Sequence, residues 1–136
     1  MFGTLAHDGS AWHGQVVFGT PARDVAVFVV TGGAEPGSRE RELFTGLVAR
    51  YASMAPDIAG ALFELYAPWQ EAALEGLPPS PSPESLLTLT ALNWMEIHAD
   101  GRIHLGYGFV DGAGWDDATF TLAIVDGAVV AESLDD

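Results

Sequence analysis

Glu96 and His104 are the residues of this chain whose types and predicted placement best suit proton transfer. They flank Asp100-Gly101, a turn sequence between two apolar runs. A three-residue loop with Gly101 in a left-handed conformation would pair Ile97 with Ile103 and bury both. The same register places Glu96 opposite His104 on the other face, where the carboxylate would favour a protonated imidazole. The pair is a candidate general acid, although a cross-strand ion pair on a solvated sheet face explains the same residues.

The histidines occur as two pairs with matching spacing, His7/His13 and His98/His104. The hairpin register predicts that His98 and His104 share one face of the sheet but lie well separated along it. A zinc site needs at least three convergent ligands with supporting contacts. Because the sequence gives no sign of such convergence, we predict neither a metal ion nor a cofactor.

The segment from Gly106 to Asp117 (GYGFVDGAGWDD) is rich in glycine, aspartate and aromatic residues. Its Gly-Tyr-Gly start resembles half of a dinucleotide fingerprint, but the helix that such a fingerprint requires does not follow. The aspartates offer hard oxygen ligands for calcium, yet their spacing does not fit an EF-hand loop. A wide connection between strands, with Trp115 packed on the core, is the ordinary interpretation. The candidate binding residues in this segment are Asp111, Trp115, Asp116 and Asp117.

The charge balance excludes several classes of partner. Nineteen acids face five bases, all of them arginine, for a net charge of −14. Nucleic acids and anionic membranes are bound through cations, which this chain lacks, so neither is an expected partner. A basic protein is the partner that electrostatics favours. Because the chain has neither lysine nor cysteine, we also exclude Walker-type phosphate loops, Schiff bases and thiol nucleophiles.

Three strand-like runs open the chain, at Phe2–Ala6, Trp12–Phe18 and Asp24–Thr31. Helical spacing of apolar residues then begins at Ser38, the predicted N-cap, and continues beyond Pro56. Pro56 lacks a backbone donor and clashes with the preceding turn, so it should interrupt or restart the helix.

A short third helix should begin at Ser82-Pro83-Glu84, and strand patterning then returns for the last third of the chain. The expected fold class is α+β in a single domain, residues 1–136. It has an antiparallel sheet of about six strands, with two or three helices inserted between an N-terminal hairpin and a C-terminal four-stranded meander. The sequence has no apolar run of about 18 residues, no signal-type start and no cysteine, so a cytoplasmic protein is expected.

Several turn and packing motifs resemble those of an uncharacterised bacterial family, domain of unknown function 2262, over most of the chain. The resemblance is carried by Trp12-x-Gly14, Tyr51…Asp57-Ile58…Leu62, Glu64-Leu65-Tyr66, Leu89-x-x-Leu92-x-x-x-x-Ile97-x-x-Asp100-Gly101, Gly112-x-Gly114-Trp115 and Asp126-Gly127. Where that family tends to carry a Gly-His pair, this chain has Asp116-Asp117. The resemblance implies that this chain shares the fold of that family. Because some relatives of the family resemble immunity proteins, it also implies a role in protein interaction.

Three hypotheses of function follow from the sequence. The leading one is a non-catalytic acidic binding module, such as an immunity-like inhibitor of a basic protein, with contacts from Glu40, Glu42 and the Asp111–Asp117 loop. The alternative is a small enzyme or a ligand- or metal-binding protein that uses Glu96, His104 and the same loop. In the third, an apolar helix surface packs against a second copy of the chain.

Overall fold

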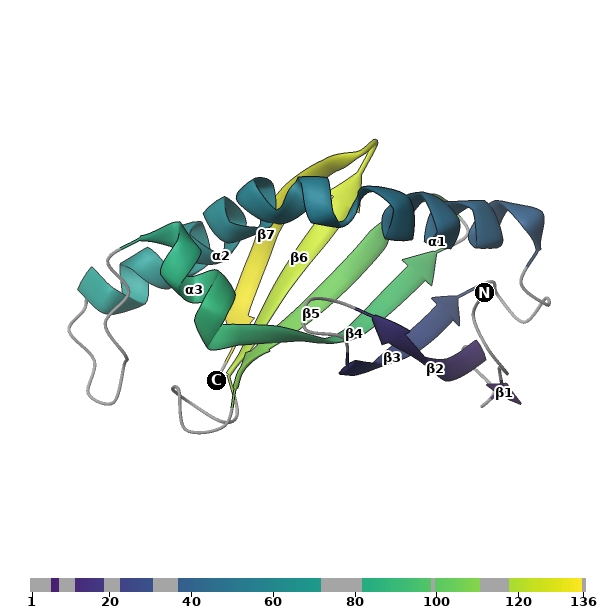
Figure 1. Cartoon of the computed structure of the whole chain (residues 1–136), viewed down its shortest axis with the longest axis horizontal. Helices are drawn as coiled ribbons and strands as arrows, with labels where there is room; N and C mark the ends of the chain where they lie inside the picture. The colour runs from purple at the N-terminus through teal and green to yellow at the C-terminus, as the bar shows by residue number, and fades with distance from the viewer. Residues whose placement is uncertain are drawn as a thin grey trace.

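One seven-stranded sheet organises the protein, and three α-helices lie against it (Figure 1). The computed structural model describes residues 6–7, 12–18, 23–30, 37–71, 82–98, 100–110 and 118–135. The elements are β1 (Ala6–His7), β2 (Trp12–Phe18), β3 (Arg23–Val30), α1 (Ser38–Arg50), a 3-10 turn (Ala52–Met54), α2 (Ala55–Glu71), α3 (Pro83–Leu89), β4 (Thr90–His98), β5 (Ile103–Phe109), β6 (Thr119–Val125) and β7 (Ala128–Asp135). The α+β class predicted from the sequence is therefore confirmed.

The strands lie side by side in the order in which they occur along the chain. Every neighbouring pair is antiparallel except β3 and β4, which run parallel, with Val27 level with Met95. A parallel pair needs a long crossover connection, and the helical segment between β3 and β4 provides it. The antiparallel sheet predicted from the sequence is therefore corrected at this one pair of strands. The parallel pair joins the N-terminal strands and the C-terminal meander into one continuous sheet.

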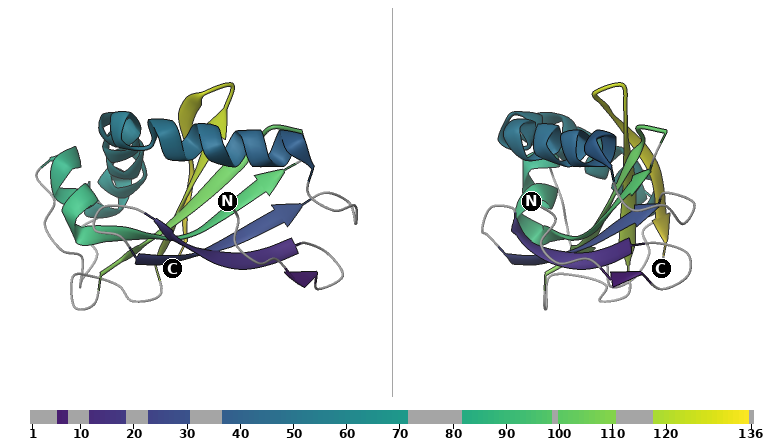
Figure 2. Two further views of the ribbon diagram at one scale, coloured as in Figure 1. Left: turned by 45° about the vertical axis from the view of Figure 1, so that its right-hand side comes forward. Right: turned by 90° about the vertical axis from the view of Figure 1, so that its right-hand side faces the viewer.

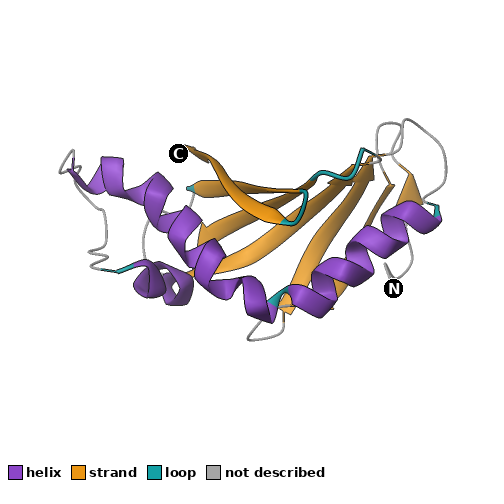
Figure 3. Cartoon of the chain, turned by 90° about the horizontal axis from the view of Figure 1, so that it is seen from above, coloured by secondary structure: helices purple, strands orange, loops and turns teal. Residues whose placement is uncertain are grey.

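The helices cover one face of this sheet (Figure 2). Helices α1 and α2 follow one another with a bend at the 3-10 turn, and Figure 3 shows both crossing the strands. Their apolar stripes meet alternate strand residues in one hydrophobic core. Fully buried members of the core include Leu47, Ile58, Leu62, Tyr66, Val27, Met95, Leu105, Phe120 and Leu122. No helix of the described part of the chain lies on the opposite face, which we call the open face.

The starts of the helices show which local predictions hold. Gly37, and not Ser38 as predicted, is the N-cap of α1. Its N–H donates to a carboxylate oxygen of Glu40 at 3.0 Å, so an acid in the first turn supplies the cap that a serine was expected to supply. The predicted break at Pro56 is confirmed, because the 3-10 turn ends at Met54 and α2 begins at Ala55, with Pro56 in its first turn.

Helix α3 begins as predicted. The Ser82 hydroxyl accepts a hydrogen bond from the Ser85 N–H at 3.3 Å, and Pro83 is the first helical residue. Within the described residues, no helix is both long and apolar enough to cross a lipid bilayer.

The β4–β5 hairpin has the predicted register. Ile97 pairs with Ile103 and Glu96 pairs with His104. Gly101 adopts a φ of 100°, the left-handed conformation that the three-residue loop requires. The turn between β6 and β7 also has two positive φ angles, 52° at Asp126 and 80° at Gly127. Such angles at both central residues are typical of the tight hairpin turn that matches strand twist.

Glycines on the open face of β5 make room for large side chains of β4. The indole of Trp94 lies directly over Gly106, so closely that an added Cβ would overlap the ring. The amide of Asn93 lies beside Gly108, where a Cβ would be 2.7 Å from its Nδ2. Both glycines are buried beneath these side chains. The Gly-Tyr-Gly sequence therefore serves strand packing, and Tyr107 between the glycines points into the core.

Candidate functional site

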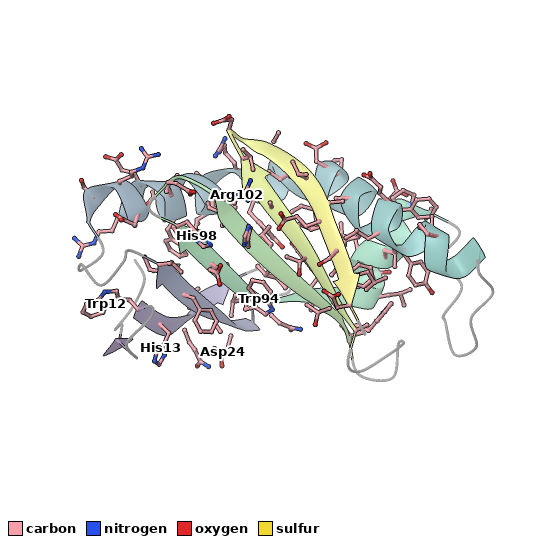
Figure 4. The ribbon with its side chains drawn as sticks, turned by 180° about the vertical axis from the view of Figure 1, so that it is seen from behind. Trp12, His13, Asp24, Trp94, His98 and Arg102 are labelled. Carbon is pink, nitrogen blue, oxygen red and sulfur yellow. The ribbon has the colours of Figure 1, made fainter. Side chains whose placement is uncertain are left out.

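Polar side chains of three strands meet on the open face. Alternation sends the apolar residues of β4 and β5 into the core and Glu96, His98 and His104 to the other side. Strand β7 contributes Glu132. Figure 4 looks onto this face and shows the side chains of His98 and Trp94 on it.

Glu96 is the centre of the cluster. Its Oε1 lies 2.6 Å from His98 Nε2, in a hydrogen bond, and 3.5 Å from His104 Nδ1. The two imidazole rings meet edge to face, with their centroids 5.1 Å apart. One carboxylate oxygen therefore faces a nitrogen of each histidine.

The predicted separation of His98 and His104 is wrong. Glu96 and His98 are two residues apart on β4 and share its open side, and His104 is directly opposite Glu96. His98 and His104 are thus diagonal neighbours across the hairpin, and diagonal neighbours about 7–8 Å apart are within reach of long or aromatic side chains. Both rings turn toward the carboxylate between them. The length of the imidazole side chains closes the distance between the two backbone positions, so that the ring centroids are 5.1 Å apart.

Glu132 approaches His104 from the other side. Its Oε1 lies 3.4 Å from His104 Nε2, the nitrogen that faces away from Glu96. This Nε2 is buried, and within the described residues it has no partner with full hydrogen-bond geometry. The contact with Glu132 is therefore close enough for an ion pair but needs a small adjustment to become a hydrogen bond.

The cluster is partly covered and still open to small molecules. The exposed fractions of the side chains are 33% for Glu96, 27% for His98, 21% for His104 and 32% for Glu132. On the β3 side, Phe28 is level with Glu96 and separates it from His13, whose ring centroid lies 6.4 Å from that of Phe28. His13 is therefore a histidine of the same face that stands apart from the cluster.

The arrangement of donors suits a metal ion. The ligand atoms of Glu96, His98 and His104 all lie within 4.8 Å of one another. Tetrahedral zinc with bonds of about 2.0–2.1 Å places its ligands roughly 3.3 Å apart. The 3.5 Å contact with His104 already has this spacing, and the 2.6 Å hydrogen bond with His98 would open by less than 1 Å on binding. The ion would replace the proton shared by Glu96 and His98.

Other candidate residues from the sequence lie elsewhere. Glu40 is only 8% exposed and is engaged in the cap of α1, whereas Glu42 is exposed on the same helix. Asp111, Trp115, Asp116 and Asp117 fall outside the described residues. The structure thus brings His98 to the predicted Glu96–His104 pair and leaves the predicted contribution of the Asp111–Asp117 loop as a prediction.

Arginines gather at a second site, a groove of about 430 Å³ between α1 and the turns of the two C-terminal hairpins. Arg39, Arg50 and Arg102 line it, but so do Glu42, Asp100 and Asp126. The Arg39 guanidinium donates to the Asp100 carbonyl at 3.4 Å and so links the helix to the hairpin. The Arg102 N–H, donating to the Asp100 carboxylate at 2.9 Å, lowers the pKa of that carboxyl. Because the groove carries balanced charges, we assign it no ligand.

Sequence reasoning missed both His98 as a member of the cluster and Glu132. A signal existed for His98, because a residue two positions from Glu96 must share its face. No comparable signal existed for Glu132, which comes from a strand that is not adjacent to β5.

In comparisons with known proteins, no family model, no curated protein and no solved structure matches the chain.

Proposed function

We propose that this protein binds a divalent transition-metal ion, with zinc as the best fit, through Glu96, His98 and His104. The observation that carries the proposal is the convergence of the three donor groups within 4.8 Å. Glu96 and His104 were paired by the sequence analysis in its alternative hypothesis, and His98 completes a set of three.

The donor types select the class of metal. Two imidazoles and one carboxylate are a common ligand set for zinc, whereas magnesium and calcium prefer sites built wholly from oxygen. Copper and nickel also favour imidazole and bind such sites tightly, so the metal held in a cell depends on supply as well as affinity. Three protein ligands leave one tetrahedral position for water or a group of another molecule. The exposure of the cluster leaves that position accessible from solvent.

Zinc titration tests the proposal. Chelator-treated protein, titrated with Zn²⁺ in competition with a chromophoric chelator, should bind one equivalent, and Mg²⁺ should not compete. Glu96→Gln, His98→Ala and His104→Ala should each weaken binding by about 100-fold, since each removes one of three ligands. Zinc at 100 times its Kd should also stabilise the fold by about 2.7 kcal/mol.

His13→Ala is the matched control, because it removes a histidine from the same face outside the cluster. This variant should bind zinc like the parent, and circular dichroism should show all four variants folded. A parent protein without saturable binding would overturn the proposal, and so would a His13→Ala defect as large as that of His98→Ala.

A second candidate function, binding of a basic protein, is favoured by the net charge of −14. Exposed carboxylates of Asp24 on β3, Asp57 and Glu64 on α2, and Glu84 on α3 add to a negative field around the molecule. A specific basic protein that this chain retains at low salt should bind the chain again after both proteins have been purified. The Kd of the purified complex should rise with ionic strength. Tight binding of RNA at physiological salt would contradict this candidate, as would failure of the purified pair to associate.

A further inference from the structure

We propose that Glu132 is a positioning residue for the metal site, which accepts a hydrogen bond from His104 Nε2–H and so directs Nδ1 toward the metal. This inference rests on the proposed zinc-binding function and assigns a role to a residue outside the ligand set.

The two nitrogens of His104 face two different carboxylates. Nδ1 lies 3.5 Å from Glu96 Oε1, inside the cluster, and Nε2 lies 3.4 Å from Glu132 Oε1, outside it. A neutral imidazole carries one proton, so one nitrogen donates while the other offers a lone pair. A proton on Nε2 would be held by Glu132, and the lone pair of Nδ1 would then point to the place where Glu96 and His98 converge.

Burial strengthens the case for this proton position. His104 Nε2 is shielded from solvent, and a Glu132 carboxylate oxygen lies 3.4 Å from it. A buried polar atom without a partner costs about 1–3 kcal/mol. A small movement of the carboxylate would turn the 3.4 Å contact into a hydrogen bond.

The sheet explains how a residue of β7 reaches a residue of β5. Strand β6 lies between them, and neighbouring strands are about 4.8 Å apart. The β6 residue opposite His104 is Ala123, whose short side chain leaves space above the sheet. Although it lies on the open face, Ala123 is only 1% exposed, so longer side chains must cover it. The long Glu132 side chain crosses at this place.

A carboxylate behind a metal-binding histidine fixes its ring orientation and raises its strength as a donor. Loss of such a partner typically weakens metal binding 10–100-fold. We therefore expect Glu132→Gln, whose amide oxygen still accepts a hydrogen bond, to weaken zinc binding about tenfold. Glu132→Ala, which removes the acceptor, should weaken it further, up to about 100-fold.

Asp135→Asn is the control. Asp135 is an exposed acid on the same strand, and its carboxylate pairs with the Ser133 hydroxyl at 3.1 Å. The substitution removes one negative charge from the same strand without touching His104, so zinc affinity should change by less than about twofold. A comparable loss in Asp135→Asn would assign the effect of Glu132 to general charge and overturn the inference.

Nitrogen-15 NMR of the histidine rings supplies a readout that a merely structural role would not produce. In the zinc-loaded parent, His104 should carry its proton on Nε2 and the metal on Nδ1, and that Nε2–H signal should shift in Glu132→Ala. Zinc bound to Nε2, or a Glu132→Ala affinity equal to that of the parent, would overturn the inference while leaving the proposed function intact. A parent that binds no zinc would overturn both.

Discussion

Gly106→Ala is expected to lower the free energy of unfolding by about 3 kcal/mol, because the new methyl group would occupy the place of the Trp94 indole. The added Cβ would overlap Cε2 and lie 2.5 Å from Cδ2, atoms at the middle of the rigid indole and not at the end of a flexible chain, so the whole ring would have to move. Either the indole leaves its position or the β4–β5 pairing distorts. Urea denaturation followed by circular dichroism would measure the loss.

A double-mutant cycle isolates the cause. In a Trp94→Ala background the methyl group has room, so Gly106→Ala should become neutral or slightly stabilising, which corresponds to a coupling energy of about 3 kcal/mol. Equal losses in both backgrounds would show that the glycine backbone, and not the indole, determines the effect.

Two other glycines serve as controls. A Cβ at Gly108 would be too close only to the end of the Asn93 side chain, at 2.7 Å from Nδ2, and would lie in ordinary contact with the Ala118 carbonyl oxygen at 3.6 Å, so Gly108→Ala should cost less than about 1 kcal/mol. Gly60 is exposed within α2, and no atom lies within 4 Å of its added Cβ. Gly60→Ala should therefore stabilise the protein by about 0.5–1 kcal/mol, the difference in helix propensity.

The second large effect is a loss of stability in alkali. Tyr107 is buried, and its hydroxyl hydrogen-bonds that of Tyr51 beneath the end of α1. Burial, reinforced by the neighbouring Tyr51, raises the pKa of Tyr107 far above its usual value of 10.0. The folded state therefore keeps this phenol neutral at a pH where the unfolded chain ionises it. Stability from this group is complete below pH 10 and falls as the pH rises above it.

Above pH 10, Tyr107 should contribute a decline of about 1.4 kcal/mol per pH unit, the free energy of one proton. Tyr51 and Tyr66 also have raised pKa values because of burial and add to the decline. Tyr107→Phe should lose about 1 kcal/mol at pH 7, the typical worth of a hydrogen bond. It should also show a shallower fall between pH 10 and 11.5.

Urea titrations at several pH values would compare the two proteins. Tyr51→Phe is a suitable control, because it removes the same hydrogen bond but leaves the more deeply buried phenol in place. Parallel stability curves for the parent protein and Tyr107→Phe would contradict the assignment of the alkaline loss to Tyr107.

Local chemistry made much of the fold predictable. Alternation of apolar residues and the left-handed preference of Gly101 were sufficient to predict the Glu96–His104 register, because a shift of one residue would have exposed Ile97 and Ile103. The position of Pro56 predicted the break between helices for an equally local reason. These features depend on contacts within a hairpin or a helical turn.

The site itself depended on more distant contacts. The parallel pairing of β3 with β4 arises from a crossover through three helices, which no local pattern specifies. Glu132 reaches His104 only because β6 places the small Ala123 between them. A side-chain pattern along one strand indicates which face of the sheet a residue occupies. It does not indicate whether a side chain from a strand two places away in the sheet can reach that residue. That distance depends on strand order and sheet twist, which emerge when the whole core packs.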